Sequence, residues 1–313
     1  NMFGRRAGLD PTAPVVMLGS HIDSVRNGGK FDGIAGVIAA LEVAQTLADR
    51  GIRTLHPIEV CALTEEEGSR FGSGLYGSRA MVEGISQKEL DRQDATGISK
   101  REAMRAFGLD PERIGEAKRK PGDIKAFLEL HIEQGPVLEQ SGKVIGIVDS
   151  IVGIRVYNVR VTGCADHAGT TPMELRRDAL VGASLVVAEV EQIAKELSPT
   201  TVATVGQLQV KPGSFNVVPS VVEFTVDMRD PVNATLDKAE SRLQEVLERV
   251  CSRRQLNFEL SRALQVDPVP SSPQIVAILE QNAQKLGLPH MHINSGAGHD
   301  AMVIARIAPI GMV

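Results

Sequence analysis

Aromatic residues and basic charge are both scarce in this chain. Only 3% of its 313 residues are aromatic, none is tryptophan, and the formal net charge is −5. Nucleic-acid-binding proteins present a basic face and stacking rings, so this composition argues against a nucleic-acid partner. The sequence also lacks any apolar run as long as the roughly 18 residues of a membrane-spanning helix. We therefore expect no membrane partner.

Cysteine is scarce as well. The three cysteines, Cys61, Cys164 and Cys251, are far apart and odd in number, which argues against a disulfide framework. We expect reduced, mostly buried thiols and a cytoplasmic location. What remains is an ordinary globular composition, 42% hydrophobic and 23% charged, in a chain long enough for two domains.

Strands and helices alternate in the first half of the chain. The hydrophobic pattern predicts a buried strand at 15–18, a helix at 33–49, and further strands at 58–63 and 125–130. Such alternation predicts an α/β domain with a mostly parallel sheet. The segment 86–120 is charged and weakly periodic, and we expect it to form surface helices and loops.

The pattern changes between residues 153 and 269. Strands are predicted at 154–163, 201–210, 221–229 and 257–266, and helices at 175–197 and 233–251. The resulting order βαββαβ is typical of a ferredoxin-like unit with an antiparallel sheet. A proline-rich linker then leads to a helix at 273–286 that resumes the first pattern. We predict a small domain of residues 153–269, inserted into a larger domain of residues 1–152 and 270–313.

Imidazole and carboxylate groups follow the predicted strands of the larger domain. His21 follows the first strand, Glu66 and Glu67 follow the second, and His131 follows the third, while Asp32 precedes the helix. Open α/β sheets place ligand sites at the carboxyl ends of their strands. Histidine and carboxylate without a nearby cysteine suit Zn²⁺, Mn²⁺ or Co²⁺. The sequence therefore predicts metal-assisted hydrolysis.

Each of these residues also has an ordinary structural interpretation. Asp32 could cap the following helix, the glutamates could form a solvated acidic loop, and a single histidine at a strand end is usually structural. Two histidines at one sheet edge favour a metal site. Asp23 stands where it could orient the His21 ring. Of the adjacent carboxylates, one could bind metal while the other removes a proton from water.

Two further residues lie in the small domain. His167 stands in a Gly-Thr-Thr-Pro turn rather than on an apolar face. Arg229 could pair with Asp227 or Asp230, or could hold a substrate carboxylate at two points. The segment 72–77 matches a dinucleotide-binding glycine pattern, but three glutamates separate it from the strand and would repel a pyrophosphate.

Eight short motifs occur in one order along essentially the whole chain: GSHIDSV, NGGKFDG, TEEEGSRFG, LHIEQGPVLE, DHAGTTPM, PGSFNVVPS, DMRD and SGAGHDA. With them the chain resembles the two-metal amidohydrolases of the M20 peptidase clan. It is most similar to the branch of N-carbamoyl-L-amino acid hydrolase, allantoate amidohydrolase and β-ureidopropionase. The resemblance implies a phosphorylase/hydrolase-like catalytic domain of the zinc-exopeptidase type, with a ferredoxin-like lid and dimerisation domain.

The resemblance also implies residue roles. Two divalent ions (Zn, Mn or Co) would be bound by His21, Asp32, Glu67 and His131, with Glu66 as general base and Asp23 orienting His21. His167 would cross from the partner subunit of a homodimer to polarise the scissile carbonyl. The implied substrate contacts are Gln134, Asn216, Arg229, Gly298 and His299, with Asn216 and Arg229 on a carboxylate.

The two ends of the chain are abrupt, and the resemblance implies further sequence on both sides. A fifth metal ligand, a histidine in a Ser-His-Ser motif, is expected beyond Val313, and an opening region before Asn1. We expect the chain as printed to bind its second metal weakly or not at all.

The expected activity is that of a hydrolase acting on carbon–nitrogen bonds other than peptide bonds, in linear amides or amidines. Its substrate would be a small carboxylated ureido compound, with N-carbamoyl-L-amino acids preferred because Val25, the glycines at 28–29 and residues 56–59 most resemble that branch. Allantoate amidohydrolase and β-ureidopropionase are the alternatives. An NAD-binding oxidoreductase that uses residues 72–77, and an inactive paralogue, are the alternatives from other classes.

Overall fold

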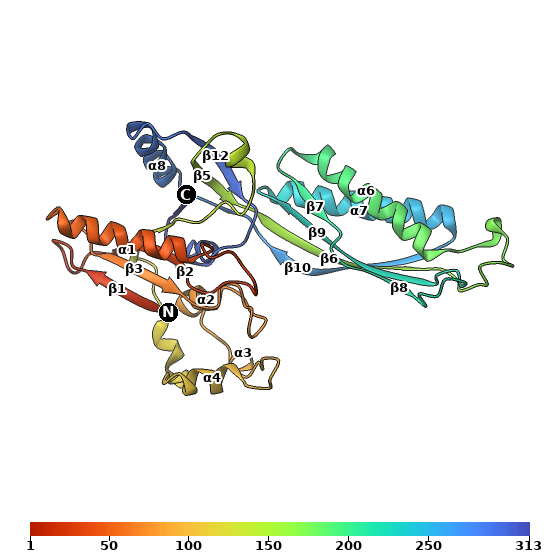
Figure 1. Cartoon of the computed structure of the whole chain (residues 1–313), viewed down its shortest axis with the longest axis horizontal. Helices are drawn as coiled ribbons and strands as arrows, with labels where there is room; N and C mark the ends of the chain where they lie inside the picture. Colours follow the sequence, from red (N-terminus) through yellow and green to blue (C-terminus); the bar gives the residue numbers. More distant parts are fainter. The chain divides into compact units, whose positions relative to one another are not determined.

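A computed structural model describes all 313 residues and divides them into two compact units (Figure 1). Unit 1 comprises Asn1–Ile151 and Pro270–Val313, and unit 2 comprises Val152–Val269. Both units combine helices with sheets, so the chain has the mixed α/β fold that the sequence predicts. None of its helices combines the length and the apolar character needed to cross a lipid bilayer.

The main sheet of unit 1 has the order β1-β3-β2-β4-β13. Its strands are β1 (Met2–Arg6), β2 (Val15–His21), β3 (Ile58–Leu63), β4 (Ile124–Glu129) and β13 (Ile310–Met312). β2 is parallel to both β3 and β4, and β13 is parallel to β4, while β1 is an antiparallel edge strand. The prediction of a mostly parallel sheet is therefore confirmed. As a result, the carboxyl ends of β3, β2 and β4 lie side by side at one edge.

The composition of these strands explains their burial. All six residues of β3 are buried, which is typical of a central parallel strand that is covered on both faces. Helix α1 (Ile34–Asp49) packs along β2. At Gly36 of this helix, a Cβ atom would lie 2.1 Å from the carbonyl oxygen of Leu130. Glycine at this position therefore lets the helix approach the β4 end of the sheet closely.

The remaining elements of unit 1 include a smaller sheet with the order β11-β5-β12, in which β5 and β12 are parallel. Its strands are β5 (Ile145–Ile151), β11 (Val269–Pro270) and β12 (His290–Ser295), and helices of the unit outside segment 86–120 include α2 (Tyr76–Val82), α5 (Val137–Gln140), α8 (Pro273–Lys285) and α9 (Asp300–Ile304). The sequence did not predict β1, β5, β12 or the short α9.

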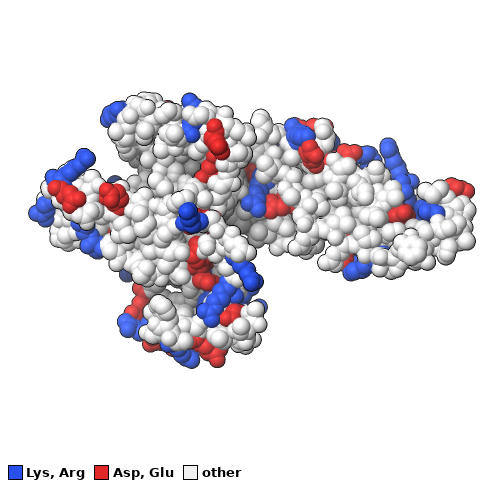
Figure 2. Space-filling model, in the orientation of Figure 1, with Lys and Arg blue, Asp and Glu red and all other residues white.

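The charged segment 86–120 forms α3 (Gln87–Leu90), α4 (Lys100–Ala106) and the 3-10 helix η1 (Pro111–Ala117). Ser99 and Glu102 form a capping box at the start of α4. Acidic and basic side chains are interspersed on the face shown in Figure 2, without a continuous patch of either sign. The segment is mostly exposed as predicted, but among its charged residues Lys100 is buried, with a side chain that is only 3% exposed.

Unit 2 is built on an antiparallel sheet with the order β10-β6-β9-β7, and β8 also pairs with β9. Its elements are β6 (Gly153–Thr162), η2 (Met173–Leu175), α6 (Ala179–Leu197), β7 (Val202–Thr204), β8 (Leu208–Lys211), β9 (Val221–Asp230), α7 (Asn233–Arg254) and β10 (Asn257–Val266). The predicted order of elements is present, with the second strand divided into β7 and β8. The predicted helix at 175 begins later, because Asp178 caps α6.

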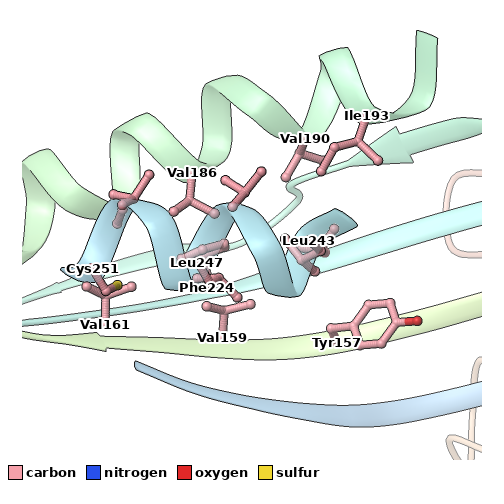
Figure 3. Packing of buried hydrophobic residues seen from close by; sticks show 14 of the residues in the cluster. Tyr157, Val159, Val161, Val186, Val190, Ile193, Phe224, Leu243, Leu247 and Cys251 are labelled. Atoms are coloured by element: carbon pink, nitrogen blue, oxygen red, sulfur yellow. The ribbon is translucent and has the colours of Figure 1, made fainter. Parts of the chain in front are cut away.

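The core of unit 2 lies between its two helices and its sheet. Val186 and Val190 of α6 and Leu247 of α7 pack with Val159 and Phe224 of the strands (Figure 3). Burying such a set of aliphatic side chains is the dominant favourable contribution to folding, at about 25 cal/mol for each Å² of apolar surface. Unit 2 therefore has a hydrophobic core of its own.

Candidate metal centre

The strand order of unit 1 brings the predicted ligands together. His21 is the last residue of β2 and pairs with Leu63 at the end of β3, which Glu66 and Glu67 follow. Ligand atoms of His21, Asp32 and His131 lie within 4.8 Å of one another, and so do those of His21, Glu66 and Glu67. Five residues from four places in the sequence thus meet at His21.

The Nε2 atoms of His21 and His131, which can each accept a hydrogen bond, point toward each other. Nδ1 of His21 donates to the carbonyl oxygen of Asp23 at 2.8 Å, and Nδ1 of His131 donates to that of Ile132 at 2.9 Å. These bonds leave a lone pair on each Nε2, and the two Nε2 atoms are 3.3 Å apart. Two facing lone pairs need a cation or a proton between them.

Asp32 adds a third electron donor to this pair. Its Oδ1 lies 3.5 Å from Nε2 of His21 and 3.2 Å from Nε2 of His131. This oxygen is buried and has no hydrogen-bond partner. Buried polar atoms are rarely left unpaired, and two imidazoles with a carboxylate suit a divalent cation. The residues present therefore fit a bound metal ion.

The pair of glutamates carries uncompensated negative charge. Glu66 is 9% exposed and Glu67 is half-buried. Burial, followed by the nearby carboxylates of Asp300 and Glu129, raises the pKa of Glu66 to about 9. The charges that raise this pKa are those of neighbouring acidic groups, so a bound cation would relieve their repulsion. The assignment of Glu66 as base and Glu67 as ligand stays a prediction.

Asp23 contacts the His21 ring through its backbone. Its backbone carbonyl, rather than its carboxylate, accepts from His21, and the nearest carboxylate oxygen is 3.9 Å from Nδ1. The carboxylate accepts the backbone N–H groups of Glu66 and Glu67, each at 3.1 Å. Asp23 thus joins the His21 loop to the glutamate turn.

Gln134 and Gly33 also lie against the ligands. Nε2 of Gln134 donates to Oδ2 of Asp32 at 3.0 Å, so the amide that was predicted to contact substrate holds the Asp32 carboxylate. Gly33 has a φ of 65°, and a Cβ atom there would lie 2.4 Å from the His21 ring. Both its conformation and the space around it call for glycine.

Two buried acids behind the site were not singled out from the sequence. Oγ of Ser20 donates to Oε1 of Glu129 at 2.7 Å, and Oγ of Ser78 donates to Oδ1 of Asp300 at 2.5 Å. Burial raises the pKa of Glu129 to about 8 and that of Asp300 to about 6. Glu129 stands two residues before His131 and Asp300 directly follows His299, which was the available signal.

His299 lies beside the ligands rather than on an open turn. The residue is 3% exposed, and its ring is 4.6 Å from that of His131 between centroids, in an edge-on contact. Its Nε2 is 2.6 Å from Oγ of Ser295. Burial lowers the pKa of His299 to about 3, so the ring is neutral. The substrate role predicted for Gly298 and His299 stays a prediction.

Of the three predicted site residues of unit 2, His167 and Asn216 lie in loops and Arg229 lies in strand β9. Nδ1 of His167 accepts the backbone N–H groups of Gly169 at 3.0 Å and Thr170 at 3.2 Å, which places the ring proton on Nε2. The turn of His167 is tied to the loop of Asn216, whose carbonyl accepts from Ala168 at 2.9 Å. Both His167 and Asn216 are exposed.

Arg229 pairs with Asp227, one of the arrangements that the sequence allows. Its Nε and Nη2 donate to the two carboxylate oxygens of Asp227 at 2.9 and 2.8 Å. The pairing raises the pKa of Arg229, so the guanidinium stays charged.

The glycine pattern at 72–77 does not form an open phosphate-binding loop. The backbone N–H groups of Leu75, Tyr76 and Gly77 donate to the carbonyls of Glu66, Glu65 and Thr64 at 2.8, 3.1 and 3.0 Å. These amides are therefore occupied by the glutamate turn and unavailable to a pyrophosphate.

The chain is similar to known amidohydrolases along its whole length. The chain is 47% identical over 314 residues to the N-carbamoyl-L-amino-acid amidohydrolase of Paenarthrobacter aurescens, covering 100% of this chain and 76% of that protein. It is 37% identical over 315 residues to the allantoate amidohydrolase of Escherichia coli K12, with 100% and 76% covered. Amidohydrolases are hydrolases that act on carbon–nitrogen bonds.

The same family is found among solved structures. A crystal structure of an amidase of the hydantoinase/carbamoylase family from Burkholderia multivorans has a TM-score of 0.90 at 43% identity, covering 99% of this chain and 75% of that chain. The family model "Peptidase family M20/M25/M40" matches residues 17–313. Amidohydrolases of this family use divalent metals, as the His/Asp cluster of this chain would allow. The chain therefore belongs to peptidase family M20/M25/M40.

Proposed function

We propose that this chain hydrolyses the carbamoyl carbon–nitrogen bond of N-carbamoyl-L-amino acids at a centre of two divalent cations, Zn²⁺, Mn²⁺ or Co²⁺. The observation that carries the proposal is the convergence of two imidazole lone pairs on one unpartnered carboxylate oxygen, that of Asp32. Relatives at 45–47% identity are named N-carbamoyl-L-amino-acid amidohydrolases, which supports the choice of substrate. His21, Asp32, Glu67 and His131 would hold the cations.

The bound cations would supply Lewis acidity and lower the pKa of a water molecule. Glu66 then accepts a proton from the attacking water and returns it to the leaving nitrogen. Burial and the neighbouring carboxylates raise the pKa of Glu66, and a cation beside it would lower that pKa again. Asp23 keeps Glu66 and Glu67 in place through their backbone amides.

Unit 2 would bind the other parts of the substrate. The ring of His167 is exposed and carries its proton on Nε2, the form needed to donate to the carbamoyl oxygen. Asn216 and Arg229 would bind the substrate carboxylate, Arg229 being oriented by Asp227. We further propose that the protein is a homodimer through residues 153–269, that His167 acts in the partner's site, and that unit 2 serves as a lid. Three free cysteines support a cytoplasmic location.

The test of the chemistry is Glu66→Gln. The variant should bind metal like the unaltered protein and lose turnover of N-carbamoyl-L-amino acids by about 10²- to 10⁴-fold, because the proton acceptor is removed. Glu139→Gln, at an exposed site on α5, is the matched control and should keep full turnover. Retained turnover by metal-loaded Glu66→Gln would contradict the assignment of the base.

Allantoate is the alternative substrate at the same site, because it too carries a ureido group and a carboxylate. The allantoate amidohydrolase of Escherichia coli is less similar, at 37% identity, which favours the carbamoyl amino acid. Parallel assays of the two compounds, by release of the free amino acid and of ammonia from allantoate, decide between them.

A further inference from the structure

The three consecutive glutamates after β3 do not place their carboxylates in the same surroundings. Glu65 has a φ of 57°, in the left-handed region that few residues other than glycine adopt. Glu66 and Glu67 lie around His21, whereas Oε2 of Glu65 lies 4.0 Å from Nζ of Lys100. One member of the acidic run therefore belongs to a different environment from the other two.

Lys100 is buried although it stands in the charged segment 86–120. Its side chain is 3% exposed. Nζ lies 3.5 Å from the ring centroid of Tyr76 and 5.3 Å from that of Phe71, so two aromatic faces surround the ammonium group. Neither Nζ of Lys100 nor Oε2 of Glu65 has a hydrogen-bond partner. The carboxylate of Glu65, the more distant carboxylate of Glu89 and the ring faces thus compensate the buried charge.

The partners of Lys100 are themselves joined. The backbone N–H of Tyr76 donates to the carbonyl of Glu65 at 3.1 Å, and that of Leu75 donates to the carbonyl of Glu66 at 2.8 Å. Lys100 attracts the side chain of Glu65 from one side and packs on the ring of Tyr76 from the other. Lys100 therefore holds Glu65, the first of the three glutamates, next to Tyr76 at the start of α2.

We propose that Lys100 is a positioning residue, which holds Glu65 so that Glu66 and Glu67 face His21. The inference rests on the proposed function, because it takes these two carboxylates as base and metal ligand. Burial lowers the pKa of Lys100 to about 8, while Glu65 raises it, so the ammonium group is charged at neutral pH. The charged segment thereby contributes to the metal centre without touching it.

The test compares Lys100→Met with Lys88→Met, an exposed lysine on α3 of the same segment. Metal is removed from each protein, and the affinity for Mn²⁺ alone is measured by calorimetry. Loss of a residue that orients metal ligands typically lowers metal affinity by about 10- to 100-fold. We expect that loss in Lys100→Met, together with a lower kcat and an unchanged KM, and no change in Lys88→Met.

Two further variants separate positioning from a general loss of stability. Glu65→Gln removes the same ion pair from the other side, and it should also weaken Mn²⁺ binding. The double variant Glu65→Gln with Lys100→Met leaves no unpaired buried carboxylate, so it should bind Mn²⁺ more tightly than Lys100→Met alone. If Lys100→Met does not fold, Glu65→Gln carries the test.

The outcomes are distinguishable. Unchanged Mn²⁺ affinity in Lys100→Met, with only a lower melting temperature of the metal-free protein, would overturn the inference and leave the proposed function standing. Failure of the unaltered protein to bind Mn²⁺, Zn²⁺ or Co²⁺ at all would overturn the proposed function and the inference with it.

Discussion

Nε2 of His21 and Nε2 of His131 point at each other across 3.3 Å, and each ring is fixed by a bond from its Nδ1 to a backbone carbonyl. In the metal-free chain this arrangement is repulsive unless one ring gains a proton. A cation between the rings, or a change in the packing against them, should therefore alter the stability of the folded chain.

Metal binding should stabilise the folded chain. At a free metal concentration of 100 times the dissociation constant, the gain in the free energy of unfolding is about 2.7 kcal/mol. Thermal melting of the stripped protein with increasing Mn²⁺ should therefore show a rising melting temperature. His131→Ala removes one of the two facing imidazoles and should abolish most of the rise. An equal rise in that variant would mean that the metal binds elsewhere.

Gly33→Ala should damage both stability and the metal centre. A Cβ atom would meet the His21 ring at 2.4 Å, and the φ of 65° is unfavourable for alanine by about 1–2 kcal/mol. Urea denaturation should show a loss of at least that size, with weaker Mn²⁺ binding. Gly29→Ala is the control, because nothing lies within 4 Å of its Cβ position. Equal stability of the two variants would contradict the prediction.

The ionisation of Lys100 should be visible in the pH dependence of stability. Burial lowers its pKa from the ordinary 10.5 to about 8. Between these values the unfolded chain binds more protons than the folded chain, so this residue makes the free energy of unfolding rise with pH. Urea denaturation of the metal-free protein from pH 8 to 10 should show a less positive slope in Lys100→Met. Parallel curves for the two proteins would mean that Lys100 titrates normally.

Mixing two inactive variants tests the proposed dimer. Glu66→Gln retains His167, and His167→Ala retains Glu66, so a mixed dimer has one complete site if His167 acts in the partner subunit. After subunit exchange, about a quarter of the full activity should return, because half of the dimers are mixed and each has one working site of two. Proven exchange without recovered activity would place His167 in the site of its own chain.

Sequence reasoning placed the two histidines at one edge of the sheet because parallel strands follow a simple rule. His21 and His131 each stand at a strand end, and neighbouring parallel strands present those ends at one edge. The same reasoning missed Lys100, since charge predicts exposure and only the folded chain brings Glu65 and Tyr76 to it. It also did not specify which oxygen of Asp23 accepts from His21, because spacing alone cannot choose between a carbonyl and a carboxylate.

Secondary structure was predicted where periodicity was strong and missed where it was short or irregular. Helix α1 and strand β3 have the predicted extents within one residue. Strand β12, His290–Ser295, alternates polar and apolar side chains without a clear buried face, and it gave no signal. Its pairing with β5 is a long-range contact that the local sequence does not encode.

The two facing histidines are 110 positions apart in the chain. An ion bound by both would cross-link the chain and close a loop that contains α1, β3, α2 and the whole charged segment. Closing so long a loop restricts mainly the unfolded ensemble, as a cross-link does. Metal loading should thus protect the exposed helices α3 and α4 from proteases, although no ligand lies on either of them.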